Sequence, residues 1–333
     1  MLVKHWYQNR LTWLSFLLLP LEALYKLISQ RKSRKDKQQA HVFRCPLVVV
    51  GNITVGGTGK TPFIIYLTHL LLKHQYRVGI VSRGYGGRAA RYPLVVTAET
   101  DVGQCGDEPK LIANATGAPV CVSPNRNEAV EALLQQHELD IILSDDGLQH
   151  YKMHRDYEIV LLDAQRGWGN GHRIPSGPLR ESINRLDHVD RVYIKQAAIA
   201  SRKELECFPS FHFAESQLLP VTGSQARPDA QQVIHAVAGI ANPEPFFVAL
   251  EQLGYRIIRH VFADHHHFSL EDFAKFRDSL IVMTEKDWVK CCTLALKHVW
   301  VVRISVKLDR VQEQDLLTDI HQLIVTSRTE NSA

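Results

Sequence analysis

The stretch GNITVGGTGKTP, residues 51–62, lies between two apolar stretches of different character. The run PLVVV (46–50) before it has the β-branched composition of a buried strand, and FIIYLTHLLLKH (63–74) after it has the composition of a helix. A glycine-rich loop that leaves a strand and opens a helix directs backbone N–H groups at phosphate. The stretch therefore predicts a phosphate-binding loop, or P-loop, at the centre of the fold.

The loop follows the general pattern G-x-x-x-x-G-K-[ST] except at its first position, where Thr54 replaces glycine. Lys60 is expected to reach the β and γ phosphate oxygens, and the Thr61 hydroxyl is expected to bind Mg²⁺. The residues predicted to bind ATP are Thr54, Val55, Gly56, Gly57, Thr58, Gly59, Lys60 and Thr61. P-loops occur in motor ATPases, in nucleotide-dependent switches and in kinases that transfer a phosphoryl group to an acceptor, so the loop alone leaves the function open.

Apolar, β-rich runs alternate with helical patterns after residue 45, which predicts a parallel sheet with helices on both faces. A second alternation starts near residue 233 and predicts a smaller α/β domain, with a helix from Pro243, one near 270–278 and one after Glu285. The predicted strands of the first alternation are 47–50, 78–82, 120–122, 141–144 and 159–163, and its helices are 60–74, 107–115 and 126–137. The strands of the second alternation are expected within VIHAVAGI (233–240), YRIIRHVF (255–262) and LIVM (280–283).

The fold class predicted from these patterns is α/β, a P-loop NTPase-like parallel-sheet domain with a second, smaller α/β domain and an N-terminal membrane-interface helix. The expected divisions are residues 1–40, 41–220 and 221–333. Between the predicted strands, the segment 163–182 is long, polar and rich in Gly and Pro. A loop of that length within a compact domain is usually functional.

The N-terminal stretch LTWLSFLLLPLEALYKLI (11–28) is rich in leucine and aromatic residues, and the basic block RKSRKDK (31–37) follows it. Pro20, Glu22 and Lys26 interrupt the apolar run, so a membrane-spanning helix is not expected. A signal peptide is not expected either, because a basic block stands where a small-residue cleavage site would be. The composition favours a helix lying in the membrane interface, and a helix packed on the protein's own core is the alternative.

Charge is distributed unevenly along the 333 residues. Residues 1–40 hold eight of the 39 Lys and Arg but two of the 35 Asp and Glu, which leaves the rest of the chain with a slight acidic excess. A body without a basic surplus argues against nucleic acid as the main partner. The six cysteines form no CxxC pair, so neither a zinc knuckle nor a disulfide framework is expected.

Acidic residues follow strands or open helices at two places. DIILSDDGLQH (140–150) is an apolar strand that ends in Asp145 and Asp146, the arrangement that holds Mg²⁺ or its waters in P-loop proteins. GDEPK (106–110) puts Asp107 and Glu108 at a helix start, with Pro109 in the first turn. Taken alone, the first is also compatible with a solvated turn and the second with a simple helix cap.

Two further stretches carry groups that suit phosphate chemistry. SRGYGGR (82–88) is a glycine-rich loop whose arginines can neutralise phosphate, although a plain surface loop fits it nearly as well. DHHH (264–267) concentrates three histidines, but consecutive side chains of an extended segment point in alternate directions and make a poor single metal site. One catalytic histidine with two neighbours of no role is therefore the better interpretation.

Together these stretches resemble the tetraacyldisaccharide 4′-kinase family, which phosphorylates the lipid A precursor of Gram-negative bacteria. The matching stretches, in the order of the family, are GNITVGGTGKTP, SRGYGG, GDEP, DDGLQH, GPLRE, DHH and MTEKD, from residue 51 to residue 287. The threonine at position 54 is also what the family shows. The resemblance implies a P-loop domain joined to a smaller α/β domain with the active site in the cleft between them.

The resemblance also implies ATP and Mg²⁺ as cofactors and the 4′-hydroxyl of a tetraacylated glucosamine disaccharide 1-phosphate as acceptor. It implies an enzyme at the cytoplasmic face of the bacterial inner membrane. By this resemblance Asp107 is the catalytic base with His265 as its partner, Thr61, Glu108 and Gln149 lie around Mg²⁺, and Arg126 and Arg180 face phosphates. The motifs themselves add Lys60 to the predicted catalytic residues, Asp145 and Asp146 to those around Mg²⁺, and Arg83 and Tyr85 of SRGYGGR to those facing phosphates or substrate.

Two other functions are weighed against this one. A membrane-associated ATPase switch of the cell-division type also joins a P-loop to a membrane-seeking helix, but it carries a signature lysine where this chain has Val55. It explains neither GDEP nor DHH. A nucleic-acid-dependent ATPase is disfavoured by the charge balance of the body. The sequence assigns no role to Lys286 or Asp287 of MTEKD.

Overall fold

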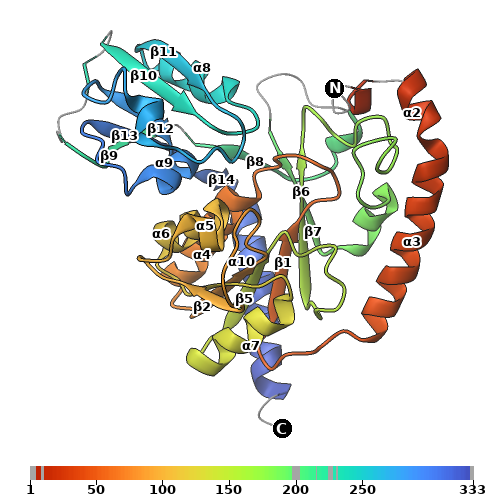
Figure 1. The fold of residues 1–333 in the computed structure, drawn as a ribbon. Coiled ribbons are helices and arrows are strands. Elements are labelled where there is room, and N and C mark those ends of the chain that lie inside the picture. Colours follow the sequence, from red (N-terminus) through yellow and green to blue (C-terminus); the bar gives the residue numbers. More distant parts are fainter. Residues whose placement is uncertain are drawn as a thin grey trace.

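The computed structural model describes residues 5–8, 11–196, 203–214, 216–223, 228–229 and 232–330. It consists of a nine-stranded sheet flanked by helices and a five-stranded sheet that lies beside one end of it (Figure 1). The large sheet has the order β14-β8-β7-β6-β1-β5-β2-β4-β3, and the small one β11-β10-β12-β13-β9. Most neighbouring strands are parallel, while the edge strands β3, β14 and β9 pair antiparallel. The predicted α/β class is confirmed.

The strands of the large sheet are β1 Leu47–Gly51, β2 Val78–Ser82, β3 Leu94–Val96, β4 Val120–Val122, β5 Ile141–Asp145, β6 Tyr157–Asp163, β7 Arg191–Lys195, β8 Ser210–Phe213 and β14 Val306–Leu308. Those of the small sheet are β9 Gln217–Pro220, β10 Val233–Ala238, β11 Arg256–Val261, β12 Ile281–Thr284 and β13 Val299–Arg303. The helices are α2 Trp13–Leu17, α3 Leu19–Gln38, α4 Lys60–Lys73, α5 Val102–Cys105, α6 Asp107–Thr116, α7 Arg126–Gln136, α8 Glu244–Gln252, α9 Glu285–Cys291 and α10 Arg310–Glu330.

Each sheet has a hydrophobic core on both faces. In the large sheet, Phe63 of α4, Ile112 of α6 and Ile320 of α10 pack on one face, and Leu133 of α7 packs on the other. In the small sheet, α8 covers one face, and Phe268, Phe273 and Phe276 cover the other. Strands β1, β2, β4, β5 and β6 are buried along their whole length, so their sequences read as apolar runs and the sequence predicted them. Strands β3 and β7 are only partly buried, and the sequence patterns did not predict them.

The chain crosses between the two sheets more often than the predicted divisions imply. β9 precedes residue 221 but belongs to the small sheet, and β14 follows the small sheet but pairs with β8 of the large one. Helix α10 then packs into the core of the large sheet. The division into 1–40, 41–220 and 221–333 stays a prediction about domains, but the sheets do not divide the chain at residue 220.

The predicted helix near 270–278 is wrong: residues 270–273 form a short 3-10 helix and turns follow. Ser269 and Asp272 close a capping box at its start. Phe273 and Phe276 are buried in the core of the small sheet.

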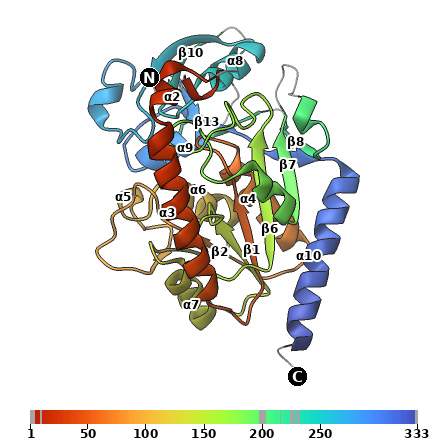
Figure 2. The ribbon, with the colours of Figure 1, turned by 90° about the vertical axis from the view of Figure 1, so that its right-hand side faces the viewer.

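Helix α3 lies along the outside of the large-sheet part (Figure 2). The buried residues of this helix are the polar Glu22 and Asp36, so its polar side faces inward. Its buried Glu22 accepts hydrogen bonds from the His172 ring (Nδ1, 3.0 Å) and the Arg173 amide (3.0 Å), both in the 163–182 loop. Tyr25 donates to the carbonyl of Arg180 at 3.2 Å. The helix thus packs on the protein through polar contacts.

The opposite side of α2 and α3 is an exposed apolar stripe, in which Trp13 is 75% exposed. We call this set the apolar stripe: Trp13, Phe16, Leu17, Leu21, Leu24, Leu27 and Ile28. Its members follow one another at steps of mainly three and four residues, which places them on one face of the helix. Among the described residues, no helix has both the length and the apolar character needed to cross a bilayer.

A buried ion pair fixes the start of α9 in the small-sheet part. Asp287 is fully buried; its Oδ2 accepts hydrogen bonds from the Thr284 hydroxyl (2.7 Å) and the Gly239 amide (3.1 Å), and its Oδ1 pairs with Lys290 at 2.7 Å. The Lys290 ammonium also donates to the Gly239 carbonyl at 3.1 Å. Asp287 therefore ties α9 to the end of β10.

Replacing Asp287 by alanine should destabilise the protein strongly, because it leaves the Lys290 ammonium buried without its carboxylate. Removing one partner of a buried pair costs about 3–5 kcal/mol of unfolding free energy. Urea denaturation followed by circular dichroism measures this loss. The matched control is Asp278→Ala, since Asp278 forms exposed pairs with Arg277 and Lys297. An unchanged urea midpoint for Asp287→Ala would show that the pair does not stabilise the fold.

Candidate active site

The P-loop leaves β1 at the point where the order of the strands reverses, since β1 is flanked by β5 and β6. Ligands of open α/β sheets bind at such a switch point, beyond the carboxyl ends of the strands. Lys60 begins α4, and Gly59 precedes it with φ +85°, a left-handed conformation that glycine adopts without strain. The predicted strand–loop–helix unit is therefore present.

The P-loop is held from outside by the 163–182 loop. The Val55 amide donates to the Pro178 carbonyl at 2.8 Å, and the Arg180 amide donates to the Ile53 carbonyl at 2.7 Å. Thr54 forms a β-bridge with Leu179. The shape of the P-loop thus depends on a segment more than a hundred residues further along the chain.

An N-terminal tyrosine also contacts the P-loop. The Tyr7 hydroxyl donates to the Val55 carbonyl at 2.8 Å, and the Arg166 guanidinium lies 5.6 Å from the centre of the Tyr7 ring. Next to it, Trp6 donates through its ring N–H to the Pro175 carbonyl at 2.9 Å. The N-terminal segment, the 163–182 loop and the P-loop therefore pack as one unit.

The two carboxylates at the end of β5 differ in surroundings. Asp145 is buried and accepts a hydrogen bond from the Ser82 hydroxyl at 3.2 Å; burial, with the Glu108 charge nearby, raises the pKa of Asp145. Asp146 has φ +48° and is partly exposed, and its carboxylate lies 3.6 Å from the Lys60 ammonium and 3.1 Å from the Arg180 guanidinium. The structure thus brings Lys60 and Asp146 together at the P-loop.

Arg126 and Gln149 lie around this turn. The Arg126 guanidinium is buried and donates to the carbonyls of Asp145 and Asp146, each at 3.1 Å. The Gln149 amide donates to the Asn52 carbonyl at 3.1 Å, and its oxygen accepts from Arg180 at 3.3 Å. Arg126 therefore holds the backbone at the end of β5, and Gln149 holds the backbone directly after β1.

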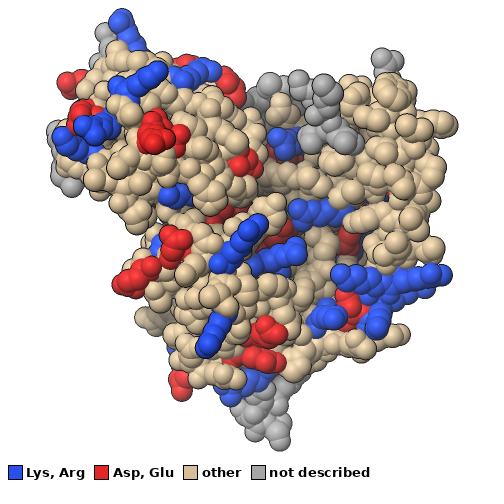
Figure 3. All heavy atoms as spheres, viewed as in Figure 1, with Lys and Arg blue, Asp and Glu red and all other residues tan. Residues whose placement is uncertain are grey.

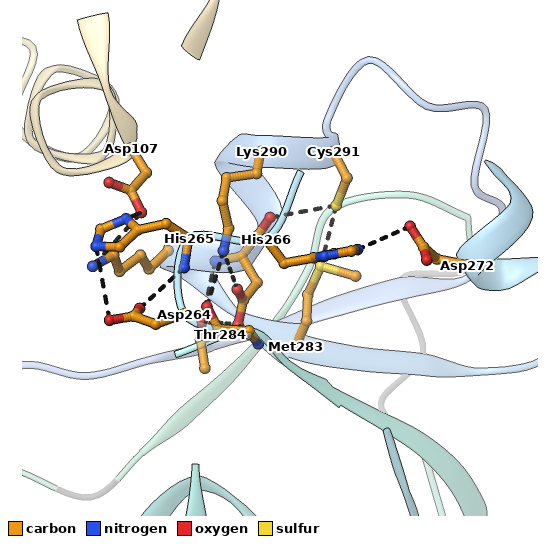
Figure 4. A network of polar contacts seen from close by, with 12 residues as sticks. Asp107, Asp264, His265, His266, Asp272, Met283, Thr284, Lys290 and Cys291 are labelled. Carbon is orange, nitrogen blue, oxygen red and sulfur yellow. Dashed lines mark hydrogen bonds and ion pairs between the residues drawn. The ribbon is translucent and has the colours of Figure 1, made fainter. Parts of the chain in front are cut away.

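The predicted pair Asp107 and His265 is formed in the structure. Asp107 opens α6, while His265 follows β11 in the small-sheet part, and the His265 Nδ1 lies 2.8 Å from the Asp107 Oδ2 (Figure 4). His265 has φ +59°, a strained conformation for a residue with a Cβ atom, and such strain clusters at functional sites. The contact joins the two sheet-containing parts.

The other residues of the 264–267 segment have different environments. His266 pairs with Asp272 at 3.1 Å and stacks on Phe262. It therefore has a structural role, whereas the sequence analysis expected two of the three histidines to have none. His267 is exposed. One histidine of the three therefore reaches the site.

The loop after β2 reaches the same region. Tyr85 is exposed, and its ring meets the His265 ring edge-on with centroids 5.5 Å apart. Arg83 is also exposed. Burial, together with the nearby positive charge of Arg83, lowers the pKa of Arg126. Figure 3 shows a hollow between the two parts of the molecule where acidic and basic side chains gather.

Sequence reasoning missed two contacts at the site. The Lys286 ammonium lies 3.0 Å from the Glu108 Oε1 and 3.6 Å from the Asp107 Oδ2, although MTEKD gave no sign of a partner so distant in sequence. Tyr7 contacts the P-loop, although it belongs to none of the motifs that the sequence analysis singled out. Each contact joins segments that no local pattern connects.

The difference between two glycines of the P-loop gives a test of its geometry. A Cβ atom at Gly59 would lie 3.3 Å from Phe213 and 3.4 Å from Phe211, whereas one at Gly57 would meet no atom within 4 Å. Gly59→Ala adds the left-handed strain of about 1–2 kcal/mol, and thermal unfolding should begin several degrees lower. Gly57→Ala is the control and should leave the melting temperature unchanged. Equal melting temperatures for the two variants would contradict the geometry.

Comparisons with known proteins agree with this arrangement. A family model described as tetraacyldisaccharide-1-P 4′-kinase matches residues 14–324. The tetraacyldisaccharide 4′-kinase of Azotobacter vinelandii is 45% identical over 312 residues, which cover 91% of this chain and 92% of that protein. The one of Pasteurella multocida is 42% identical over 328 residues, covering 96% of this chain and 99% of that protein.

A solved structure extends the comparison to the fold. The crystal structure of LpxK from Aquifex aeolicus in complex with ATP superimposes with a TM-score of 0.74 at 26% identity, covering 93% of this chain and 99% of that one. The family match spans both sheets and the segments that form the site. This chain belongs to the tetraacyldisaccharide-1-P 4′-kinase family.

Proposed function

We propose that this protein transfers the γ-phosphoryl group of ATP to the 4′-hydroxyl of a tetraacylated glucosamine disaccharide 1-phosphate. The observation that carries the proposal is the Asp107–His265 contact, because it adds a proton acceptor to a P-loop site. The relatives are named as kinases of this substrate, and the Aquifex structure is in complex with ATP. A switch ATPase needs no such pair.

In the proposed reaction the acceptor oxygen attacks the γ-phosphorus while the bond to the β,γ-bridging oxygen breaks and ADP leaves. Asp107 accepts the proton of the 4′-hydroxyl, and the His265 ring orients the carboxylate from the other part of the protein. Lys60 neutralises charge that develops on the phosphate oxygens. Arg83, Tyr85 and Arg180 lie in loops around this point and are candidates for binding phosphates or the acceptor.

The site also suits Mg²⁺, which would neutralise charge on the β and γ phosphates. Within the described part of the chain, the Asp145 Oδ1 and the Thr58 hydroxyl are buried without a hydrogen-bond partner. Thr61 lies in the first turn of α4. The described residues contain no group of three or more His, Cys, Asp or Glu that could hold a metal by themselves. Mg²⁺ needs no such group, because it keeps several waters and binds one or two carboxylates with the phosphates.

The ligands we propose for Mg²⁺ are Thr61 with Asp145 and Asp146, and Glu108 and Gln149 as further neighbours. Glu108 and Gln149 are less direct candidates, since Lys286 pairs with the first and the Gln149 amide is bonded within the protein. Arg126 would act indirectly, since it donates hydrogen bonds to the backbone carbonyls of Asp145 and Asp146. These assignments extend the sequence predictions and rest on contacts around the P-loop.

We further propose that the apolar stripe of α2 and α3 docks on the cytoplasmic face of the inner membrane, where an acylated acceptor resides. The basic residues of the 31–37 block are exposed on the same helix. An aromatic and aliphatic face with a neighbouring basic block is typical of interfacial helices. The enzyme would thereby meet its acceptor without extracting it from the bilayer.

Lys60→Ala should abolish phosphoryl transfer without unfolding the protein, since Lys60 is the first residue of α4 and its side chain is proposed to neutralise phosphate charge. The assay follows ³²P from labelled ATP into the lipid disaccharide, with circular dichroism as the measure of folding. ATP consumption by the unchanged protein should depend on the disaccharide 1-phosphate. Rapid ATP hydrolysis without acceptor would favour the switch ATPase instead, and full activity of Lys60→Ala would refute the site.

Phe16→Glu combined with Leu24→Glu should release the protein from vesicles that contain anionic phospholipid. Both side chains are more than half exposed, so the fold should persist. Point variants are preferable to deletion of the helix, because deletion also removes the Glu22 contacts. Val311→Glu adds charge at an exposed valine of α10 and is the control. Unchanged flotation of the double variant would place the docking surface elsewhere.

A further inference from the structure

Lys286 reaches from the small-sheet part to the first turn of α6. It lies in the first turn of α9, and its side chain is largely buried, with 22% exposed. The ammonium is 3.0 Å from the Glu108 Oε1 and 3.6 Å from the Asp107 Oδ2. It therefore approaches the same Asp107 oxygen that faces His265.

The backbone that carries Lys286 is fixed on both sides. Thr284 caps α9 by accepting from the Asp287 amide at 3.1 Å, and Asp287 is itself held by the buried pair with Lys290. Glu285 pairs with Arg303 of β13 at 2.8 Å. A side chain that starts from such an anchored turn holds its end group at a defined point.

The Asp107 carboxylate is fixed from three directions. Its Oδ1 accepts from the Glu108 amide at 3.0 Å, and its Oδ2 faces both the His265 ring and the Lys286 ammonium. Burial disfavours the charged ammonium, but the Glu108 and Asp107 carboxylates outweigh it and raise the pKa of Lys286. The ammonium thus reduces the repulsion between the two adjacent carboxylates of α6 and joins them to the small-sheet part.

We propose that Lys286 is a positioning residue of the phosphoryl transfer: it fixes Asp107 and Glu108 and holds the small-sheet part on α6, so that His265 stays within hydrogen-bond distance of Asp107. This inference rests on the proposed role of Asp107 and His265. Lys286 acts through that pair. Its ammonium pairs with carboxylates of α6, so we expect ATP binding by the P-loop not to depend on it.

The test is a double-mutant cycle of Lys286→Met and His265→Ala, measured as kcat and ATP KM of the full-length enzyme in mixed micelles with its lipid acceptor. Lys286→Met should lower kcat on the order of 10- to 100-fold, as a misplaced reacting group does. The ATP KM should stay within about twofold, because the P-loop is intact. In the His265→Ala background the same change should cost less than about threefold, since the contact that Lys286 supports is already gone.

Two further variants separate positioning from folding and from net charge. Lys286→Arg keeps the charge and the donors and should recover most of the lost kcat, while Lys297→Met removes an exposed lysine of the same part and should leave kcat unchanged. A loss of equal size in both backgrounds would overturn the inference, and so would a kcat for Lys286→Met within twofold of the unchanged enzyme. Full activity of His265→Ala by itself would instead refute the proposed catalytic pair.

Discussion

The first turn of α6 is where the two sheet-containing parts of this protein are held together by charge. Asp107 and Glu108 belong to the large-sheet part, and His265 and Lys286 reach them from the small-sheet part. A histidine and an ammonium that meet two adjacent carboxylates make a contact that is specific in geometry as well as in sign. Because Asp107 is buried, removing its partners would leave a desolvated carboxylate. The same contact that assembles the site therefore also contributes to holding the parts together.

A second chain of contacts connects the apolar stripe with the phosphate-binding loop. Glu22 and Tyr25 of α3 bind the 163–182 loop, which in turn holds the P-loop through backbone hydrogen bonds. Tyr7 contacts the P-loop directly. In a helix packed on a hydrophobic core the apolar side faces inward, whereas in α3 the polar side faces inward and the apolar side is exposed. An exposed apolar face of this kind is typical of helices that lie in a membrane interface. The surface that would meet the lipid and the loop that would bind ATP thus share one scaffold.

The sequence predicted the parts of the fold that depend on local patterns. Strands buried on both faces, such as β1 and β5, appear as unbroken apolar runs, and the glycine pattern of residues 56–61 identified the P-loop. Strand β8 and the edge strands β9 and β14 are short and only partly buried, so they give no comparable signal. The pairing of β14 with β8 joins residues almost a hundred positions apart, which no periodicity reveals.

The candidate site divides in the same way. Residue types and motif order were enough to name Asp107, His265 and Lys60. The sequence assigned no role to Lys286, because its contacts depend on where α9 meets α6. The sequence also did not show that the neighbouring Asp287 is a buried residue of the core. The helix predicted near 270–278 was wrong, since the segment is a short 3-10 helix, Leu270–Phe273, followed by turns.

The central claim is that Asp107 and His265 act as one unit across the two parts of the protein. The most direct measurement is kcat for Asp107→Ala, His265→Ala and the double variant, at saturating ATP and lipid acceptor. General-base catalysis is worth roughly 10²- to 10⁴-fold, so each single variant should lose about that much. The account predicts that the double variant is little worse than the poorer single variant. Losses that multiply in the double variant would contradict it, because they would show two independent roles.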